Sequence, residues 1–248
     1  VDILGDRFQL SEKEVVLAFD YTEENFYGDV QGFWIYGWTG EHAVTGKFKF
    51  LTCSIVSSDI PKIPLISVPV YVGHSMAREV SWCYSMVKPL VKSIKLVLFD
   101  RGFFSKDLIL ALNKACYPYL IFVPKNQKVK KELEKMALYE KKKIIYEFKL
   151  NKNKTVIKGE TTLALLKNIF DKRSGKKFDW SFATNQLEIN LDSFVPTYKC
   201  RWRIETGFRV QDEAHIMSKS VLANIRFFYF VYEQVLQLLW GILYKEEV

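Results

Sequence analysis

Two largely apolar stretches of this sequence each end directly before an aspartate. The stretch Val15–Phe19 precedes Asp20, and the stretch Lys95–Phe99 precedes Asp100 and the turn residue Gly102. Short runs rich in β-branched and aromatic residues are typical of strands buried on both faces. We therefore expect two buried strands, each with a carboxylate where the strand runs out into solvent.

The surrounding pattern predicts three strands, a helix, a strand, a helix and a strand, in that order. This order is that of the ribonuclease H-like α/β core, a mixed five-stranded sheet flanked by helices, in which the first three strands are antiparallel. The expected elements are strands at Val15–Phe19, Phe33–Thr39 and Lys47–Ser57, a loop with Pro61, Pro64 and Pro69, a helix from about Ser75 to Val91, a strand at Lys95–Phe99, a helix at Lys106–Ala115 capped by Ser105, and a strand at Tyr119–Val123.

A basic segment follows this core. Residues 124–177 hold 17 Lys and Arg against 6 Asp and Glu, so the segment carries +11 while the whole chain carries +8. We expect residues 124–185 to be an inserted β-rich subdomain. It separates a first core part, 1–123, from a final helical part, 186–248, which completes the catalytic core. The expected elements of the insertion are a helical or irregular stretch at Lys125–Lys143 and strands at Lys143–Leu150, Lys154–Leu163 and Phe178–Thr184.

A basic lobe beside a mildly acidic body suits a polyanionic partner such as DNA. Lys125 and Lys128, at the start of the segment, are candidate DNA contacts. The alternative is a solvated lysine surface with no partner.

A second candidate region begins after Pro196, in the position where helices start. At about 100° per residue, one stripe of the expected helix carries a phenol, guanidinium groups and carboxylates, while Ile204 lies beside it and faces a core. The alternative is a solvated amphipathic face. The residues of this stripe are Tyr198, Arg201, Glu205, Arg209 and Asp212.

Packing of this helix across the sheet would bring Glu205 to the edge that carries Asp20 and Asp100. Ligands of open α/β sheets bind at the carboxyl ends of the strands. Three carboxylates in one cleft need a hard cation, and their oxygens suit Mg²⁺ or Mn²⁺. Two such ions about 3.5–4 Å apart activate a water molecule and stabilise the leaving oxygen of a phosphodiester. The sequence therefore predicts a two-ion site for phosphodiester chemistry.

Three motifs together resemble the signatures of the DDE transposases of insertion sequences. They are Leu17-Ala18-Phe19-Asp20-Tyr21-Thr22, Leu98-Phe99-Asp100-Arg101-Gly102-Phe103 and Tyr198-x-x-Arg201-x-x-x-Glu205, with Phe182-Ala183-Thr184-Asn185 upstream of the third. The resemblance implies a ribonuclease H-like fold and an endonuclease reaction in which water and then a 3′-hydroxyl attack DNA phosphodiesters.

The same resemblance implies roles for individual residues. Asp20, Asp100 and Glu205 would form the catalytic metal-binding triad, while Tyr198 and Arg201 would contact phosphates near the transposon end. A lysine often found seven residues after the glutamate is replaced by Asp212, so Arg209 and Lys219 are candidates to supply its charge. The implied partner is double-stranded DNA, both transposon ends and target, bound by a homodimer in a prokaryotic cytoplasm at the nucleoid.

Trp180 is a further DNA-contact candidate. Phe178, Trp180 and Phe182 alternate along one face of an expected strand, so the neighbouring rings would hold the indole toward an extruded base. Some members of the family cut DNA through a hairpin, in which such a base is stacked on a matching tryptophan. The alternative is a tryptophan buried in the core of the strand.

Two other functions fit parts of the sequence. One is a domesticated or decayed transposase that only binds DNA, and the other is a ribonuclease H-like nuclease of repair or recombination. The cysteines Cys53, Cys83, Cys116 and Cys200 are scattered, which favours reduced thiols and makes a zinc site improbable. The most apolar run, Phe227–Tyr244, contains Glu233 and is short for a membrane span, so we expect no membrane association.

Overall fold

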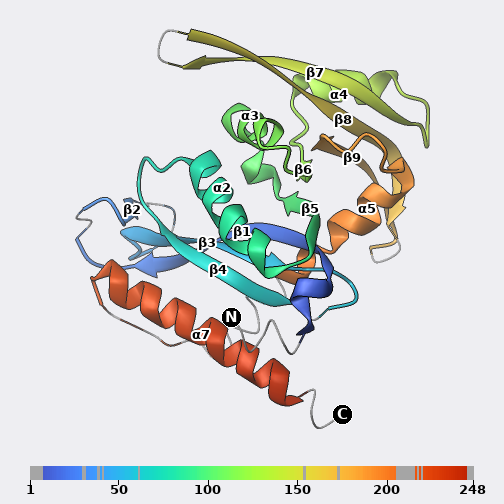
Figure 1. The fold of residues 1–248 in the computed structure, drawn as a ribbon. Helices are drawn as coiled ribbons and strands as arrows, with labels where there is room; N and C mark the ends of the chain where they lie inside the picture. The colour runs from blue at the N-terminus through green and yellow to red at the C-terminus, as the bar shows by residue number, and fades with distance from the viewer. Residues whose placement is uncertain are drawn as a thin grey trace.

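The computed structural model describes residues 8–29, 32–37, 40, 42–60, 62–152, 155–171, 174–204, 216, 218 and 220–244. The strands of this part of the chain form one mixed sheet of nine strands, and helices cover both of its faces (Figure 1). The fold is thus a mixed α/β fold built around a single large sheet.

Five strands form the centre of the sheet in the order β4-β3-β1-β5-β6. Neighbouring pairs β4/β3 and β3/β1 are antiparallel, whereas β1/β5 and β5/β6 are parallel. The parallel pairs therefore end at one common edge of the sheet. The bounds are β1 (Glu14–Phe26), β3 (Gly46–Ile55), β4 (Ile63–Val70), β5 (Ser93–Phe99) and β6 (Tyr119–Phe122).

The basic segment continues this same sheet. Its strands are β7 (Lys141–Lys152), β8 (Thr155–Asp171) and β9 (Lys176–Thr184), and β9 pairs antiparallel with β6. The hairpin β7–β8 extends beyond the body of the protein (Figure 1). The β-rich character predicted for this segment is confirmed, and the division of the chain into parts 1–123, 124–185 and 186–248 stays a prediction.

Three elements expected in the first 70 residues differ from the structure. The strand carrying Asp20 does not end there, because β1 continues to Phe26 along β3. The strand expected at Phe33–Thr39 is reduced, in its described part, to β2 (Tyr36–Gly37). The expected proline loop is strand β4, which tolerates Pro64 and Pro69 because an edge strand has unpaired N–H positions.

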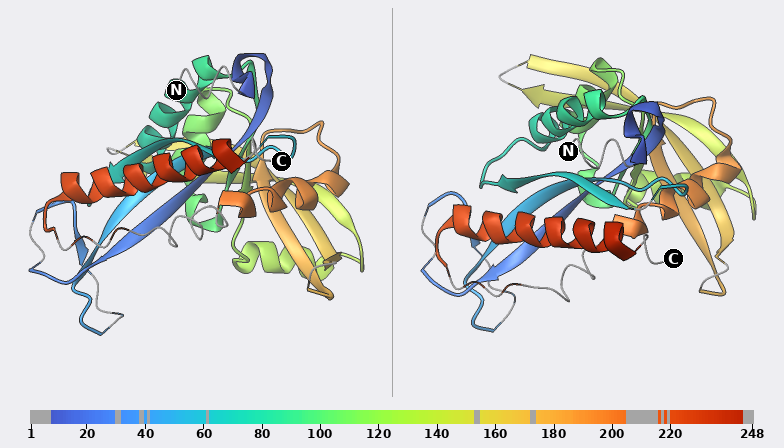
Figure 2. Two further views of the ribbon diagram at one scale, coloured as in Figure 1. Left: turned by 90° about the horizontal axis from the view of Figure 1, so that it is seen from below. Right: turned by 60° about the horizontal axis from the view of Figure 1, so that its bottom comes forward.

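Among the described helices, three pack against one face of the sheet and two against the other. Helices α2 (Met76–Val87), α3 (Lys106–Lys114) and α4 (Gln127–Lys135) pack on the first face, while α5 (Leu191–Lys199) and α7 (Ala223–Tyr244) lie against the second (Figures 1 and 2). The remaining described helical segments are the 3-10 turns η1 (Leu10–Glu12), η2 (Lys88–Leu90) and η3 (Arg101–Phe103).

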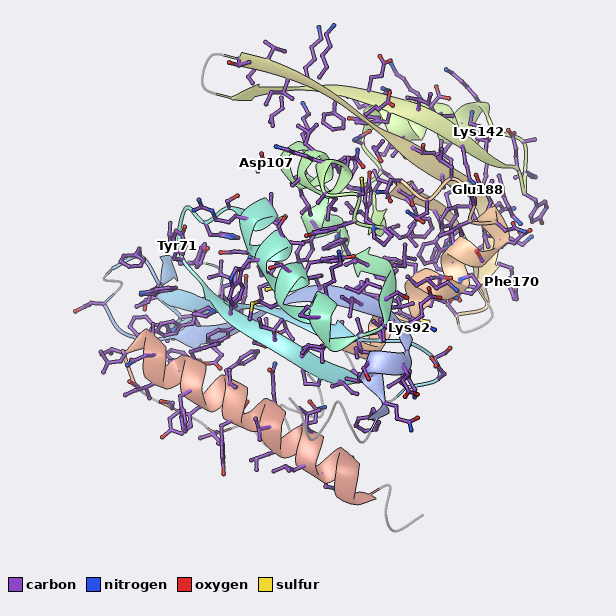
Figure 3. The ribbon with its side chains drawn as sticks, viewed as in Figure 1. Tyr71, Lys92, Asp107, Lys142, Phe170 and Glu188 are labelled. Carbon is purple, nitrogen blue, oxygen red and sulfur yellow. The ribbon has the colours of Figure 1, made fainter. Side chains whose placement is uncertain are left out.

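Local sequence signals explain where these helices begin and end. Ser75 and Ser105 accept hydrogen bonds from Arg78 N and Leu108 N as N-caps of α2 and α3. The regular helix α2 ends at Val87 rather than at Val91, because Pro89 lies in the following 3-10 turn. Figure 3 labels Tyr71 and Lys92, which lie near the two ends of the crossover from β4 through α2 to β5.

Alternation along β1 divides the core into two clusters. Leu17 and Phe19 face α2 and α3, while Ala18 faces α5. All three side chains are fully buried. Asp20, two residues after Ala18, therefore lies on the α5 face.

Helix α5 begins earlier than the sequence indicated. It starts at Leu191 with Asn190 as N-cap, and Pro196 lies inside it rather than before it. Ion pairs between lysines and aspartates hold both of its ends. Lys141 of β7 pairs with Asp192 in its first turn, and Lys199 at its end pairs with Asp171 of β8. Part of the excess lysine charge therefore serves the fold.

None of the helices in the described ranges is both long enough and apolar enough to cross a lipid bilayer. This finding agrees with the polar side chains that interrupt the apolar run of α7.

We expect Asp171 to make the stability of the protein sensitive to acid. Hydrogen bonds from Lys199 and from Ser174 lower the pKa of Asp171 from its usual 3.8 to about 2. A carboxylate with a depressed folded-state pKa stabilises the fold fully above its unfolded pKa and loses that effect as the pH falls through its folded pKa. Asp171→Asn should lower the melting temperature at pH 7, and the difference from wild type should shrink as the pH falls from about 4 toward about 2.

Asp192→Asn, which removes the exposed partner of Lys141, is the matched control and should have a smaller effect. Thermal unfolding monitored by circular dichroism across this pH range measures both variants. A pH-independent difference for Asp171→Asn would contradict the prediction.

Candidate active site

The structure places Asp20 and Asp100 side by side. In the parallel pair β1/β5, Phe19 is in register with Phe99, and each aspartate follows its phenylalanine directly. Neighbouring strands lie about 4.8 Å apart, so the two backbones are one strand spacing apart at this point. The juxtaposition that the sequence pattern predicted is present, although β1 itself runs on past Asp20.

Each of these carboxylates accepts a hydrogen bond from the backbone of the next residue. Asp20 Oδ1 accepts from Tyr21 N at 2.9 Å, and Asp100 Oδ1 accepts from Arg101 N at 2.6 Å. Asp100 is the N-cap of η3, so the chain turns away from the sheet immediately after β5. These bonds orient both carboxylates at the carboxyl edge of the parallel strands.

Arg201 brings the C-terminal part of the chain to this edge. Its Nη1 donates to Asp20 Oδ2 at 3.3 Å, and its Nε donates to the Tyr198 hydroxyl at 3.2 Å. The arginine side chain is 5% exposed and the aspartate side chain 18% exposed. The Arg201 guanidinium therefore lies beside the Asp20 carboxylate and balances its negative charge.

The segment that carries Arg201 is a turn between the end of α5 and a helical turn that begins at Trp202. Backbone N–H groups of Cys200, Arg201, Arg203 and Ile204 each donate to the carbonyl three residues earlier. Such i to i−3 bonding aligns side chains three apart, and Tyr198, Arg201 and Ile204 are all buried. Ile204 thus reaches the core as expected, but it shares the row of Tyr198 and Arg201 rather than lying beside it.

Arg203 fixes this segment from its other side. Its guanidinium donates to the carbonyls of Val56 and Ile60 at 3.2 Å and 2.8 Å, and also to that of Ser57. Arg203 occupies an unspecified position of the Tyr198-x-x-Arg201-x-x-x-Glu205 motif. Its anchoring role depends on a loop about 145 residues earlier in the chain, so no local signal indicates it.

Glu205, Arg209 and Lys219 lie outside the described residues. Ile204, the residue before Glu205, belongs to the same buried cluster as Ala18 of β1 and Leu98 of β5. The chain therefore reaches the face of the two aspartate-bearing strands one residue before the glutamate. The assignment of Glu205 to the site stays a prediction.

The donor set fits a hard cation. Two carboxylates with no sulfur or imidazole ligand between them suit Mg²⁺ or Mn²⁺, and Arg201 shows that Asp20 accepts a positive charge in this position. Among the described residues there is no group of three His, Cys, Asp or Glu that could hold a metal ion. A third protein ligand would have to come from elsewhere in the chain.

The predicted DNA contacts occupy different environments. Lys125 follows β6, whose carboxyl end lies at the same edge as that of β5, and its side chain is exposed. Lys128 of α4 is also exposed, and its Nζ lies 4.2 Å from the ring centroid of Tyr146. Tyr198 and Arg201, in contrast, are buried, and Arg201 pairs with Asp20. Phosphate contact by any of these four residues stays a prediction.

Trp180 is packed inside an aromatic cluster. Its ring stacks on Phe182 with centroids 5.9 Å apart and meets Phe122 edge-on at 5.8 Å. Only 9% of the residue is exposed, and its Nε1 has no hydrogen-bond partner within the described part of the chain. This arrangement corresponds to the alternative in which Trp180 is buried in the core of its strand. Base stacking by Trp180 stays a prediction.

Sequence reasoning also missed a polar network beside Asp20, on the same face of the sheet. Thr52, which pairs with Asp20 across β1 and β3, bonds to Ser67 of β4 at 2.9 Å. Gln234 of α7 contacts both hydroxyls, at 2.8 Å and 3.4 Å. The sequence signal for this network was the presence of polar residues inside the apolar run of α7. By themselves these residues indicated only that the helix does not span a membrane.

Comparison with known proteins agrees with this geometry. The family described as the transposase DDE domain matches residues 82–227, more than half of the chain's 248 residues. The chain belongs to this family. The match includes the positions of Asp100 and Glu205 and begins after Asp20.

A solved structure shares the fold. The piggyBac transposase, in its synaptic complex with hairpin DNA, superposes with a TM-score of 0.55 at 13% sequence identity. The alignment covers 89% of this chain and 45% of that chain, so the chain spans less than half the length of that transposase. No curated protein matches the sequence.

We expect the Asp20–Arg201 ion pair to stabilise the fold measurably. Arg201→Met should destabilise the protein by about 2–3 kcal/mol, because it leaves a half-buried carboxylate without its cation. Adding Asp20→Asn to Arg201→Met should restore part of the loss, since the remaining amide needs no counter-charge. Urea unfolding of the two single variants and the double variant measures the coupling free energy.

The exposed pair Lys95–Glu14, with atoms 4.0 Å apart, is the control. Its double-mutant cycle should give a coupling below about 1 kcal/mol. Equal coupling for the two pairs would show that Arg201 does not hold Asp20 specifically.

Proposed function

We propose that this chain contains the catalytic domain of a DNA transposase that cleaves and joins strands at transposon ends with the help of divalent metal ions. The observation that carries the proposal is the alignment of Asp20 and Asp100 on adjacent parallel strands, with the Arg201 segment packed over them. Membership in the transposase DDE domain family supports it.

The strand order supports a ribonuclease H-like core. The order is β4-β3-β1-β5-β6, antiparallel across the first three strands and parallel across the last two pairs, and β4 supplies the third antiparallel strand although the sequence predicted a loop there. In that fold the first and fourth strands carry two acidic residues, here Asp20 and Asp100. A helix after the last core strands brings the third, here Glu205.

Asp20, Asp100 and Glu205 would hold two Mg²⁺ or Mn²⁺ ions. When bound, such ions lower the pKa of a water molecule and stabilise the leaving oxygen of a phosphodiester. In the first step, water attacks the phosphorus at the transposon end and the bond to O3′ breaks, which leaves a 3′-hydroxyl and a 5′-phosphate. In the second step, this 3′-hydroxyl attacks a phosphodiester of the target and releases a new 3′-hydroxyl.

Residues of this chain would orient the DNA in both steps. Arg201 donates a hydrogen bond to Asp20. Once metal ions neutralise the Asp20 carboxylate, the Arg201 guanidinium would donate to a phosphate oxygen of the DNA instead. Lys125 and Lys128 flank the edge at which β5 and β6 end. The solved piggyBac complex contains DNA, which supports DNA as the partner here. The proposed partner is double-stranded DNA, and the proposed binding form of the protein is a homodimer.

Single substitutions of the triad test the proposal. Asp20→Ala, Asp100→Ala and Glu205→Ala should each abolish Mg²⁺-dependent cleavage of a labelled DNA end and leave DNA binding nearly unchanged, because the carboxylates bind metal rather than DNA. Asp59→Asn, an exposed loop aspartate, is the control and should react like wild type. Gel analysis of products and band-shift titration measure the two properties.

The same assay separates the alternatives. Cleavage followed by joining supports a transposase, cleavage without joining supports a nuclease of repair or recombination, and binding without reaction supports a decayed transposase. Retained cleavage in all three alanine variants would overturn the proposed site.

DNA binding through α4 predicts a salt effect. For duplex DNA, the slope of log affinity against log salt concentration changes by about 0.9 for each phosphate contact. Lys125→Ala and Lys128→Ala should each reduce the magnitude of the slope by about that amount. Lys141→Ala is the matched control, because Lys141 already pairs with Asp192. Fluorescence anisotropy at several salt concentrations gives the slopes, and identical slopes for all three variants would exclude α4 as a contact surface.

A further inference from the structure

Four aromatic rings form a continuous ladder directly behind the two aspartates. Phe19 stacks on Phe99 with centroids 5.3 Å apart, and Tyr21 stacks on Phe103 at 4.8 Å with ring planes 8° apart. Phe99 and Phe103 are themselves 5.3 Å apart. The ladder belongs to the cluster on the α2 and α3 face, opposite the face of Asp20.

The ladder joins the two chain segments that carry the carboxylates. Tyr21 follows Asp20, and because successive residues of a strand point to opposite faces, its ring lies behind the Asp20 carboxylate. Phe103 ends the η3 turn that Asp100 caps, and its N–H donates to the Asp100 carbonyl at 3.0 Å. The Tyr21–Phe103 stack therefore links one residue beyond Asp20 to three residues beyond Asp100.

This link begins where the backbone pairing stops. The described register of β1 with β5 ends at Phe19 and Phe99, and from there β1 continues along β3 while the other chain turns into η3. Phe19 and Phe99 are thus the last residue pair of the β1/β5 register, and the two aspartates lie just beyond it. The ring stack is positioned to set the separation of the two carboxylates just past the end of the ladder.

Several groups hold the ring of Tyr21 in place. Lys49 Nζ lies over it at 4.3 Å from the centroid and pairs with Glu23 at 3.6 Å. His74 meets the ring edge-on at 6.0 Å, and its Nδ1 lies 2.6 Å from Glu79 Oε2. This surrounding shell restricts the ring to one position against Phe103.

The hydroxyl of Tyr21 contributes little to this arrangement. Within the described residues it has no hydrogen-bond partner. Burial, together with the nearby Glu79 carboxylate, raises the pKa of Tyr21 well above its usual value, so the phenol stays neutral. The ring, rather than the hydroxyl, is the part of Tyr21 that makes the contacts described above.

We infer that Tyr21 and Phe103 are positioning residues that fix the spacing of Asp20 and Asp100, and that their stack thereby tunes the affinity of this pair for a divalent cation. The inference rests on the proposed function, because the cation is the one assigned to that site. Partners behind metal ligands typically change metal affinity 10- to 100-fold when they are replaced.

Mn²⁺ titration of the whole chain without DNA, by isothermal calorimetry, tests the inference alongside thermal unfolding. Tyr21→Leu and Phe103→Leu should each weaken Mn²⁺ binding about 10-fold. Their double variant should be little weaker than either single one, since both remove the same stack. Tyr21→Phe keeps the ring and should bind Mn²⁺ within about 2-fold of wild type, because no partner of the hydroxyl is lost.

A closer stack elsewhere in the fold provides the control. Tyr84 of α2 stacks on Tyr117 at 3.6 Å with ring planes 16° apart. Tyr117 comes two residues before Tyr119, which pairs with Val97, so this stack lies toward the end of β5 opposite to Asp100. Tyr84→Leu should lower the melting temperature and leave Mn²⁺ affinity unchanged. Phe103→Met, a milder change of a buried ring, replaces Phe103→Leu should the latter fail to fold.

The outcomes separate this inference from the proposed function. Wild-type affinity for Mn²⁺ in folded Tyr21→Leu and Phe103→Met, together with weakened binding in Asp20→Asn, would overturn the positioning role and leave the metal site intact. A wild-type chain that binds no Mn²⁺, or an Asp20→Asn variant that binds it normally, would overturn both. Weakened binding in the leucine variants with normal binding in Tyr21→Phe and Tyr84→Leu supports the inference.

Discussion

The parallel pairing of β1 with β5 is the constraint on which the rest of this structure depends. It joins residues about 80 positions apart, and its register, Phe19 with Phe99, sets Asp20 beside Asp100. A one-residue shift of this register would move one carboxylate to the opposite face of the sheet. The register is in turn specified by burial, because Leu17, Ala18, Val97 and Leu98 are fully buried on both faces.

Two carboxylates at one sheet edge repel each other, and the fold compensates with cationic and dipolar partners. Backbone N–H groups and the Arg201 guanidinium provide these partners for Asp20, and η3 provides a capping N–H for Asp100. The same ion pair draws the segment 198–204 across the sheet, with Arg203 fixing its far side. A site that attracts a divalent cation thus also contributes to the packing of the C-terminal part.

The lysine-rich segment has two physical roles. Lys141 and Lys143 of β7 bond to Asp192 of α5 and to the carbonyl of Ile189, and Asp171 of β8 pairs with Lys199 of α5. These contacts hold α5 and the chain before it. The lysines of α4, among them Lys128, are exposed. A net charge counted along the sequence merges these two groups. Only the exposed group is available to a polyanion such as DNA, so the electrostatic surface is smaller than the charge of +11 implies.

The sequence by itself determined the central strands, the capped helices and the pairing of Asp20 with Asp100, because apolar runs and N-cap residues act locally. It misjudged β4, since the tolerance for Pro64 depends on an edge position that only the sheet defines. It also misjudged the start of α5, which Asn190 caps although Pro196 follows inside the helix. Tertiary structure alone decided that Arg201 faces Asp20, that Arg203 reaches the carbonyl of Ile60, and that Tyr21 stacks on Phe103. Each of these contacts joins segments far apart in sequence, and no local periodicity encodes the register that brings them together.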